Sequence, residues 1–81
     1  MYLHLGQETV IRGSGIIGIF DMETATMSKH TRAFLKKAEQ DGRVFNVSYE
    51  LPKAFILSGD KNRDTVYISQ LGTPTLLKRT K

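Results

Sequence analysis

The residues Gly13-Ser14-Gly15-Ile16-Ile17-Gly18 form a G-x-G-x-x-G pattern, the spacing found where a backbone turn cradles the pyrophosphate of a dinucleotide. That chemistry requires a helix N-terminus directly after the pattern, because the helix N–H groups bind the phosphates. Here the pattern runs into Ile16-Ile17-Gly18-Ile19-Phe20, an apolar run that favours a strand. We therefore expect a glycine-rich bend between two strands and no dinucleotide cofactor. Backbone amides in such a bend can still hold an anion, and Arg12 stands beside it.

A second pattern, Asp60-x-Asn62-x-Asp64, matches the first ligand positions of a calcium-binding loop. Such a loop needs Gly at its sixth position for the sharp turn and a bidentate Glu at its twelfth. The chain has Thr65 and Leu71 at these positions, so we interpret the segment as a polar loop between two strands.

The histidines and nucleophiles form no recognisable catalytic set. His4 and His30 are far apart in the sequence, and neither has the second histidine four residues away that a helical metal site uses. The chain has no cysteine, which excludes thiolate chemistry and sulfur-liganded zinc. No Ser-His-Asp, nucleophile-elbow or paired-carboxylate signature stands out. We therefore expect no enzymatic activity, no cofactor, no metal and no small-molecule substrate.

Positive charge is the remaining chemical signal. The 12 basic and 8 acidic residues give a net charge of +4, which favours a polyanionic partner, although solubility alone would explain it. Lys29, Arg32 and Lys36 would form a basic row on one helix, a pattern that is usually only a solvated face and otherwise a polyanion contact. No standard DNA-reading motif is present. Five further basic residues fall at strand ends or turns, where two or three of them could converge on one rim of a sheet and bind nucleic acid: Arg12, Arg43, Lys53, Lys61 and Arg63.

Six short strands and two helices would position these residues. Apolar runs, alternating or continuous, predict strands at residues 2–5, 9–12, 16–20, 44–48, 53–58 and 65–69, the last two forming a hairpin. An amphipathic helix is predicted from about residue 28 to residue 40, with an apolar stripe at Met27, Thr31, Phe34, Leu35 and Ala38.

The ends of the helices carry their own signals. We expect Ser28, or else Thr26, to cap the start of the main helix, and Gly42 to end it. Thr73-Pro74 predicts a short last helix, because proline suits the first helical position. The predicted fold class is therefore α+β, a single domain over residues 1–81 with a small, mostly antiparallel sheet, one main amphipathic helix and a short C-terminal helix.

Two of the predicted strand segments, residues 16–20 and 54–57, are apolar on both faces. One helix covers one face of a sheet, and the chain supplies little to cover the other. This excess apolar surface favours self-association, and the alternative is a sheet that curls and buries both faces against itself. The residues expected at the oligomer interface are Ile16, Ile17, Ile19, Phe55 and Leu57.

Five segments carry a resemblance to a known family: Met1-Tyr2-Leu3-His4-Leu5-Gly6, Ile16-Ile17-Gly18-Ile19-Phe20-Asp21, Phe34-Leu35-Lys36-Lys37, Pro52-Lys53-Ala54 and Thr75-Leu76-Leu77-Lys78-Arg79. No single piece is a strong motif, but their order and spacing together resemble the RemB (YaaB-like) proteins of Gram-positive bacteria over nearly the whole chain. These are relatives of the biofilm-matrix regulator RemA, within a family named only as a domain of unknown function.

The resemblance implies a role in regulating the transcription of extracellular-matrix and biofilm genes. For the RemA branch it implies ring-shaped oligomers that contact DNA through a fold likened to LytTR domains. That branch carries an arginine where this chain has Gly15 and an arginine pair where it has Glu50 and Leu51, while a further basic position is matched by Lys53. The oligomeric scaffold therefore transfers better than the DNA-contact surface, although Arg12 and Lys53 could compensate.

Composition and compartment complete the expectations. Hydrophobic residues make up 40% and charged residues 25% of the chain, which is typical of a globular protein. The first residues lack a signal-peptide pattern, and no apolar stretch approaches the roughly 18–20 residues that span a membrane, so we expect a cytoplasmic protein without membrane contact. The leading hypothesis is a ring-forming regulator that binds duplex DNA through phosphate contacts. The alternative is a module that forms the same oligomer and binds another regulatory protein without tight DNA binding.

Overall fold

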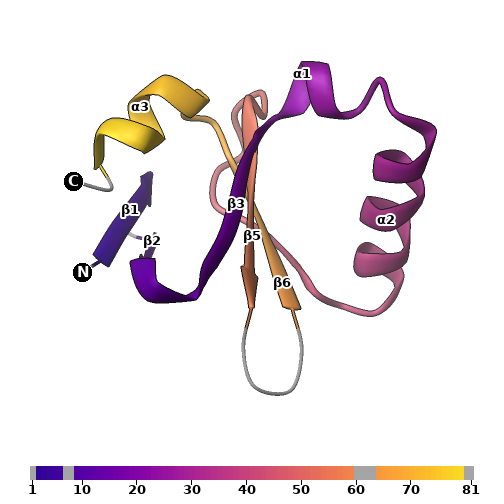
Figure 1. The fold of residues 1–81 in the computed structure, drawn as a ribbon, viewed down its shortest axis with the longest axis horizontal. Helices are drawn as coiled ribbons and strands as arrows, with labels where there is room; N and C mark the ends of the chain where they lie inside the picture. The colour runs from indigo at the N-terminus through magenta and orange to yellow at the C-terminus, as the bar shows by residue number, and fades with distance from the viewer. Residues whose placement is uncertain (1, 7–8, 60–63, 80–81) are drawn as a thin grey trace.

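The computed structural model describes residues 2–6, 9–59 and 64–79. Over these residues the chain has the predicted α+β fold, with six strands in two sheets, a main helix and a short C-terminal helix (Figure 1). The elements are β1 (Tyr2–Gly6), β2 (Thr9–Arg12), the 3-10 turn η1 (Gly13–Gly15), β3 (Ile16–Asp21), α1 (Met22–Ala25), α2 (Lys29–Gln40), β4 (Val44–Asn46), β5 (Ala54–Gly59), β6 (Asp64–Ser69) and α3 (Thr73–Arg79).

The strands form a four-stranded sheet of order β3-β5-β6-β4 and a separate two-stranded ribbon of β1 and β2. β5 pairs antiparallel with both β3 and β6, whereas β4 pairs parallel with β6. Cross-strand partners share a face, so Ile19, Ile56 and Tyr67 lie on one face, and Phe20 and Phe55 lie on the other. β3 and β4 are the two edges of this sheet.

Both faces of the four-stranded sheet are covered within the chain. α2 lies on one side, and the β1–β2 ribbon and α3 lie on the other (Figure 1). On the α2 face Ala38 packs against Phe55 and Val66. On the other face the fully buried Leu3 and Leu76 belong to the core around the centre of the sheet. This second cover is not evident in the sequence, because the first two strands form a ribbon of their own and do not join the main sheet.

Local signals set the ends of α2 as predicted. The Ser28 hydroxyl caps the helix by accepting a hydrogen bond from the Thr31 backbone N–H at 3.4 Å. Thr26, the competing candidate, instead donates its hydroxyl to the Met22 carbonyl at 2.6 Å. At the other end Gly42 has φ 72°, a left-handed conformation that glycine adopts without strain.

The structure adds a short helix, α1, between β3 and α2 that the sequence analysis did not predict. Asp21 caps it by accepting a hydrogen bond from the Thr24 backbone N–H at 2.8 Å. This hydrogen bond holds the pKa of the Asp21 carboxyl below its ordinary value of 3.8. Because α1 intervenes, Met27 lies in the connection to α2 and is exposed, so its assignment to the apolar stripe of the main helix was wrong. The remaining residues of the stripe are buried to different degrees: Ala38 is fully buried against the sheet, whereas Phe34 is partly exposed.

Candidate nucleic-acid interface

Among the described basic residues, Arg12 and Lys53 lie at opposite ends of the four-stranded sheet. Arg12 ends β2 and leads through η1 to Ile16, which pairs with Ser58 near the far end of β5. Lys53 precedes β5 at the opposite end of the sheet, where its carbonyl accepts a hydrogen bond from the Met22 N–H at 2.9 Å. The full length of β3 therefore separates Arg12 from Lys53, so these two do not share a rim, whereas Arg43 lies toward the Arg12 end of the sheet, where it contacts Asp64.

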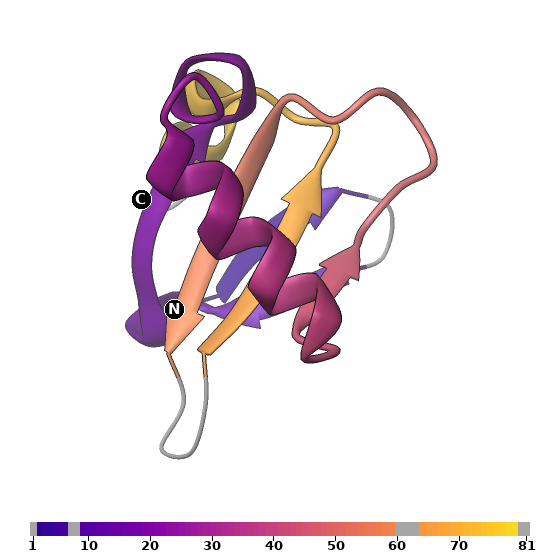
Figure 2. The same cartoon turned by 90° about the vertical axis from the view of Figure 1, so that its right-hand side faces the viewer.

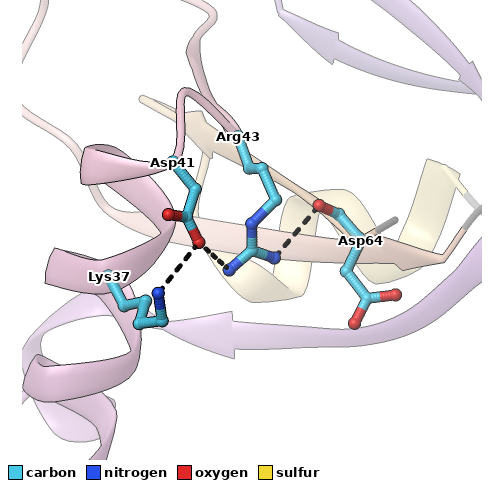
Figure 3. A network of polar contacts seen from close by, with 4 residues as sticks. All are labelled: Lys37, Asp41, Arg43 and Asp64. Atoms are coloured by element: carbon cyan, nitrogen blue, oxygen red, sulfur yellow. Dashed lines mark hydrogen bonds and ion pairs between the residues drawn. The ribbon is translucent and has the colours of Figure 1, made fainter. Parts of the chain in front are cut away.

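Arg43 is engaged inside the protein. Its guanidinium donates a hydrogen bond to the Asp64 carbonyl at 3.2 Å and lies 3.6 Å from the Asp41 carboxylate, which also pairs with Lys37 at 3.5 Å (Figure 3). Only 17% of the Arg43 side chain is exposed, and its guanidinium carbon lies 6.0 Å from the centre of the Phe34 ring. These contacts connect the end of α2 to β6, so Arg43 contributes to the packing of the helix on the sheet.

The basic row on α2 is also partly used. Arg32 donates two hydrogen bonds from one guanidinium nitrogen, to the Thr26 carbonyl at 2.7 Å and to the Met27 carbonyl at 3.1 Å. It therefore stabilises the connection between α1 and α2. Lys29 and Lys36 are exposed on the solvent side of the helix, as a solvated face would place them.

Arg12 borders a polar cavity of about 490 Å³ between the β2–η1 corner and the ends of β5 and β6. Ser58 and Thr65 are direct cross-strand partners on the ribbon-facing side of the sheet, and Tyr67 lies two residues further along β6 on the same side. η1 brings Ser14 to the opposite wall. The cavity thus combines one guanidinium with four hydroxyl groups from three separate segments.

The glycine-rich turn closes tightly on the hairpin at this cavity. The Ser58 hydroxyl donates a hydrogen bond to the Gly15 carbonyl at 3.3 Å. A Cβ atom built on Gly15 would lie 3.2 Å from the Gly59 carbonyl oxygen, closer than most real Cβ contacts. A side chain at this position would therefore push the turn away from the hairpin, and the bend between two strands predicted for the glycine pattern is confirmed.

The lining of the cavity suits an oxyanion. The Arg12 side chain is exposed and has no hydrogen bond or ion pair with the residues that the structure describes. The described lining residues include no carboxylate, and Asp64 lies on the α2 side of β6, because strand residues alternate between faces. A guanidinium presents a planar set of N–H donors that match phosphate oxygens, and hydroxyls can add further donors.

Other predicted positions are only partly placed. Lys61 and Arg63 lie outside the described residues, as do Asp60 and Asn62 of the calcium-like pattern. Within residues 2–6, 9–59 and 64–79, His, Cys, Asp and Glu side chains form no group of three that could hold a metal ion. None of the described helices is long and apolar enough to cross a membrane.

The residues predicted for an oligomer interface lie on both sides of the sheet. Phe55 is only 3% exposed and stacks on Phe20 with ring centres 5.0 Å apart. Ile16 and Ile19 are half-buried against the ribbon-side core. Ile17 has no partner on β5, because the register shifts between Ile16 and Gly18, and 61% of it is exposed at the free edge of β3. The fifth of these residues, Leu57, is half-buried on the α2 side.

A second hollow, which the sequence analysis missed, lies between β3 and α2. It has a volume of about 270 Å³, and we call it the groove; its lining residues are Phe20, His30, Thr31, Phe34, Phe55 and Leu57. The sequence signal that could have indicated it is Gly18, where a Cβ atom would lie 2.6 Å from the tip of the Phe20 ring. The missing side chain at Gly18 leaves room for this ring on the face of the sheet.

Comparison with known proteins supports the predicted resemblance. No protein-family model matches the sequence. The chain is 37% identical over 79 residues to Extracellular matrix regulatory protein B of Bacillus subtilis (strain 168), and the aligned region covers 98% of this chain and 89% of that protein. On this identity over nearly the full length of both proteins, the chain belongs to the family of extracellular matrix regulatory protein B (RemB).

Proposed function

We propose that this protein is a non-enzymatic regulator of extracellular-matrix genes that acts as a homo-oligomer, a ring, and binds duplex DNA through phosphate contacts. The relative's name, Extracellular matrix regulatory protein B, supports the regulatory role. The observation that carries the DNA contact is the polar cavity beside Arg12, with its hydroxyl lining and a guanidinium that pairs with none of the described residues.

A phosphate of the DNA backbone is the ligand that this cavity suits best. The Arg12 fork can contact two phosphate oxygens, while hydroxyls such as Ser14 and Thr65 lie on the cavity walls. Such contacts fix the position of the duplex but carry no sequence information. The proposed binding is therefore nearly independent of sequence and weakens steeply with salt.

Oligomerisation would multiply this weak contact. Each copy brings one such cavity and a net charge of +4, so an assembly presents several phosphate sites to one duplex. Linking sites in this way raises affinity without any new contact, provided that the duplex is long enough to reach several of them. Long duplexes should therefore bind more tightly than short ones.

A second function, a module that forms the same oligomer and binds protein without tight DNA binding, rests on a different observation. The segment from residue 47 to residue 53, which we call the 47–53 loop, carries Tyr49 and Leu51, and both side chains are exposed to solvent. Exposed large apolar side chains in one loop are typical of a contact with protein, either another copy of this chain or a different protein, and not of a DNA contact.

The experiment that tests the first function measures the mass of the purified protein by light scattering and then adds duplex DNA at low salt. We expect a mass of several chains and a salt-sensitive shift of duplexes longer than two helical turns. An oligomer that shifts no duplex at low salt would refute DNA binding and leave the protein-interaction module. A single-chain mass would refute the oligomer, which both proposed functions require.

A further inference from the structure

We propose that the 47–53 loop of one copy docks into the groove between β3 and α2 of the next copy, so that the chains assemble head to tail. This inference rests on the homo-oligomer of the proposed function and names the two surfaces that form it. It is independent of the Arg12 cavity and of DNA.

The groove exists because α2 leaves part of the sheet uncovered. α2 crosses the sheet at an angle and packs on β6 and β4 (Figure 2), and a hollow stays open between its first turns and Phe20 of β3. Gly18 adds no side chain on this face, so the Phe20 ring lies over it and stacks on Phe55. Phe34 of α2 forms the facing wall. The result is an apolar hollow at the edge of the sheet that the chain itself does not fill.

The size and lining of the groove suit one aromatic side chain. Its volume of about 270 Å³ falls below the roughly 300–1,000 Å³ of typical small-molecule pockets. Its lining is almost wholly aromatic or aliphatic, and only His30 and Thr31 add polar atoms. Aromatic anchors that fill such hollows contribute much of the binding energy of protein interfaces.

The 47–53 loop carries side chains of the required kind. Tyr49 is fully exposed at 108%, and Leu51 is 80% exposed. The Glu50 backbone N–H donates to the Ser48 hydroxyl at 3.1 Å, which holds the bend, and Pro52 restricts the chain beyond it. A loop that is already ordered loses less entropy on docking than a flexible one.

The loop crosses one end of the sheet. It leaves the sheet from β4, at the edge far from the groove, and returns to β5 beside the start of α1 (Figure 2). Tyr49 is fully exposed, so a copy does not fill its own groove with its own loop. Contacts between two different surfaces repeat from copy to copy, and they produce a closed ring when the rotation between copies closes.

Charge favours the same pairing. Glu50 stands between the two apolar side chains of the loop, and the groove is bordered by the start of α2, where Lys29 and His30 lie. No acidic residue occurs in the first turn of α2. The N-terminus of a helix carries partial positive charge, so an approaching carboxylate is attracted there.

The test uses two variants that each remove one surface. Tyr49→Glu places a charge at the loop tip, where the exposed side chain contributes little to folding, and Phe34→Glu places a charge in the groove. Leu77→Glu on α3 is the matched control, since Leu77 is also a large exposed apolar residue but lies outside both surfaces. Each protein is measured alone by light scattering, and the two variants are then mixed in equal amounts.

We expect the wild type and Leu77→Glu to form the same oligomer, and each of the other two variants to give a single chain of 9.1 kDa. In the mixture, one intact loop meets one intact groove, so the two variants should form a particle of two chains and nothing larger. An oligomer held by contacts of one surface with itself, such as one β3 edge with another β3 edge, would not produce a two-chain particle only on mixing the two variants.

Several results would overturn the inference. If the wild type assembles and either surface variant keeps the full mass, or if the mixture stays as single chains, the loop and groove do not meet, although the proposed oligomer stands. A wild type that is itself a single chain refutes the oligomer and this contact together. Should Phe34→Glu fail to fold by circular dichroism, Thr31→Arg, which fills the groove from a half-buried helix position, takes its place with the same expectations.

Discussion

Replacing Arg12 with alanine tests the phosphate contact directly. Arg12 is exposed and its side chain makes no hydrogen bond or ion pair with a described residue, so the free energy of unfolding should change by less than about 0.5 kcal/mol on substitution with alanine. Each copy has one such cavity, so the substitution removes one phosphate contact for every copy that touches DNA. The logarithm of the binding constant should therefore fall less steeply with the logarithm of salt, by about 0.9 for each copy engaged.

The size of the effect follows from the same relation. A fourfold rise in salt weakens binding about 3.5-fold for each phosphate contact, so a duplex held by several copies loses much of its affinity in the wild type and less in the variant. The assay is fluorescence anisotropy of a labelled duplex at a series of salt concentrations, with two unrelated sequences. Because phosphate contacts are independent of sequence, both duplexes should lose the same fraction of affinity.

Two control variants make this result interpretable. Arg12→Lys keeps the charge but loses the planar fork, so the salt dependence should return while the affinity recovers only in part. Lys53→Ala removes a positive charge at the opposite end of the sheet. If the duplex binds along the end that carries Arg12, this substitution should weaken binding less than Arg12→Ala does. An Arg12→Ala variant whose salt dependence matches that of the wild type would refute the reasoning from the cavity.

Three further predictions concern stability. Ser69 is 1% exposed, donates its hydroxyl to the Leu5 carbonyl and accepts a hydrogen bond from the Leu71 N–H, so Ser69→Ala should lower the free energy of unfolding in urea by about 1–3 kcal/mol. Gly18→Val should displace the Phe20 ring, lower the melting temperature and weaken assembly through the groove; an unchanged mass and melting temperature would contradict the packing described. The Asp21 carboxyl has a lowered pKa, so its stabilising effect is complete above its ordinary pKa of 3.8 and is lost as pH falls through the lower folded value. Below about pH 4, the unfolding free energy of Asp21→Asn should therefore depend less on pH than that of the wild type.

The elements were predictable where the signal is local. The hydroxyl of Ser28 and the left-handed Gly42 set the ends of α2 from within a few residues, and the apolar run of β3 excluded a helix after the glycine pattern. α1 was missed because its signal is short, an aspartate cap followed by a single turn that makes only a few hydrogen bonds. Propensity alone rarely identifies so short a helix.

The positions of the site residues depended on tertiary structure and could not be predicted in the same way. Arg12 and Lys53 both lie at strand ends, but no local sequence signal indicates that they lie at opposite ends of the sheet, separated by the full length of β3. The groove arises because α2 covers β6 and β4 and leaves Phe20 at the sheet edge. Arg43 resembled a candidate phosphate ligand in the sequence, and its contacts with Asp41 and Asp64 appear only once α2 and β6 are packed together.

The pairing of the first strand with the last helix has a consequence for how the protein is made. Leu3 and Leu5 of β1 share a core with Leu76 of α3, and the Arg79 guanidinium donates to the His4 carbonyl at 3.5 Å. The two ends of the described chain meet in one corner (Figure 1). Synthesis proceeds from the N-terminus, so β1 leaves the ribosome well before α3. Leu3 and Leu5 of β1 therefore cannot pack against Leu76 until α3 has been synthesised. Contacts between residues so distant in the chain also slow folding. The nascent polypeptide therefore keeps these apolar side chains exposed to aggregation until α3 has emerged, and only then can the ribbon-side core close.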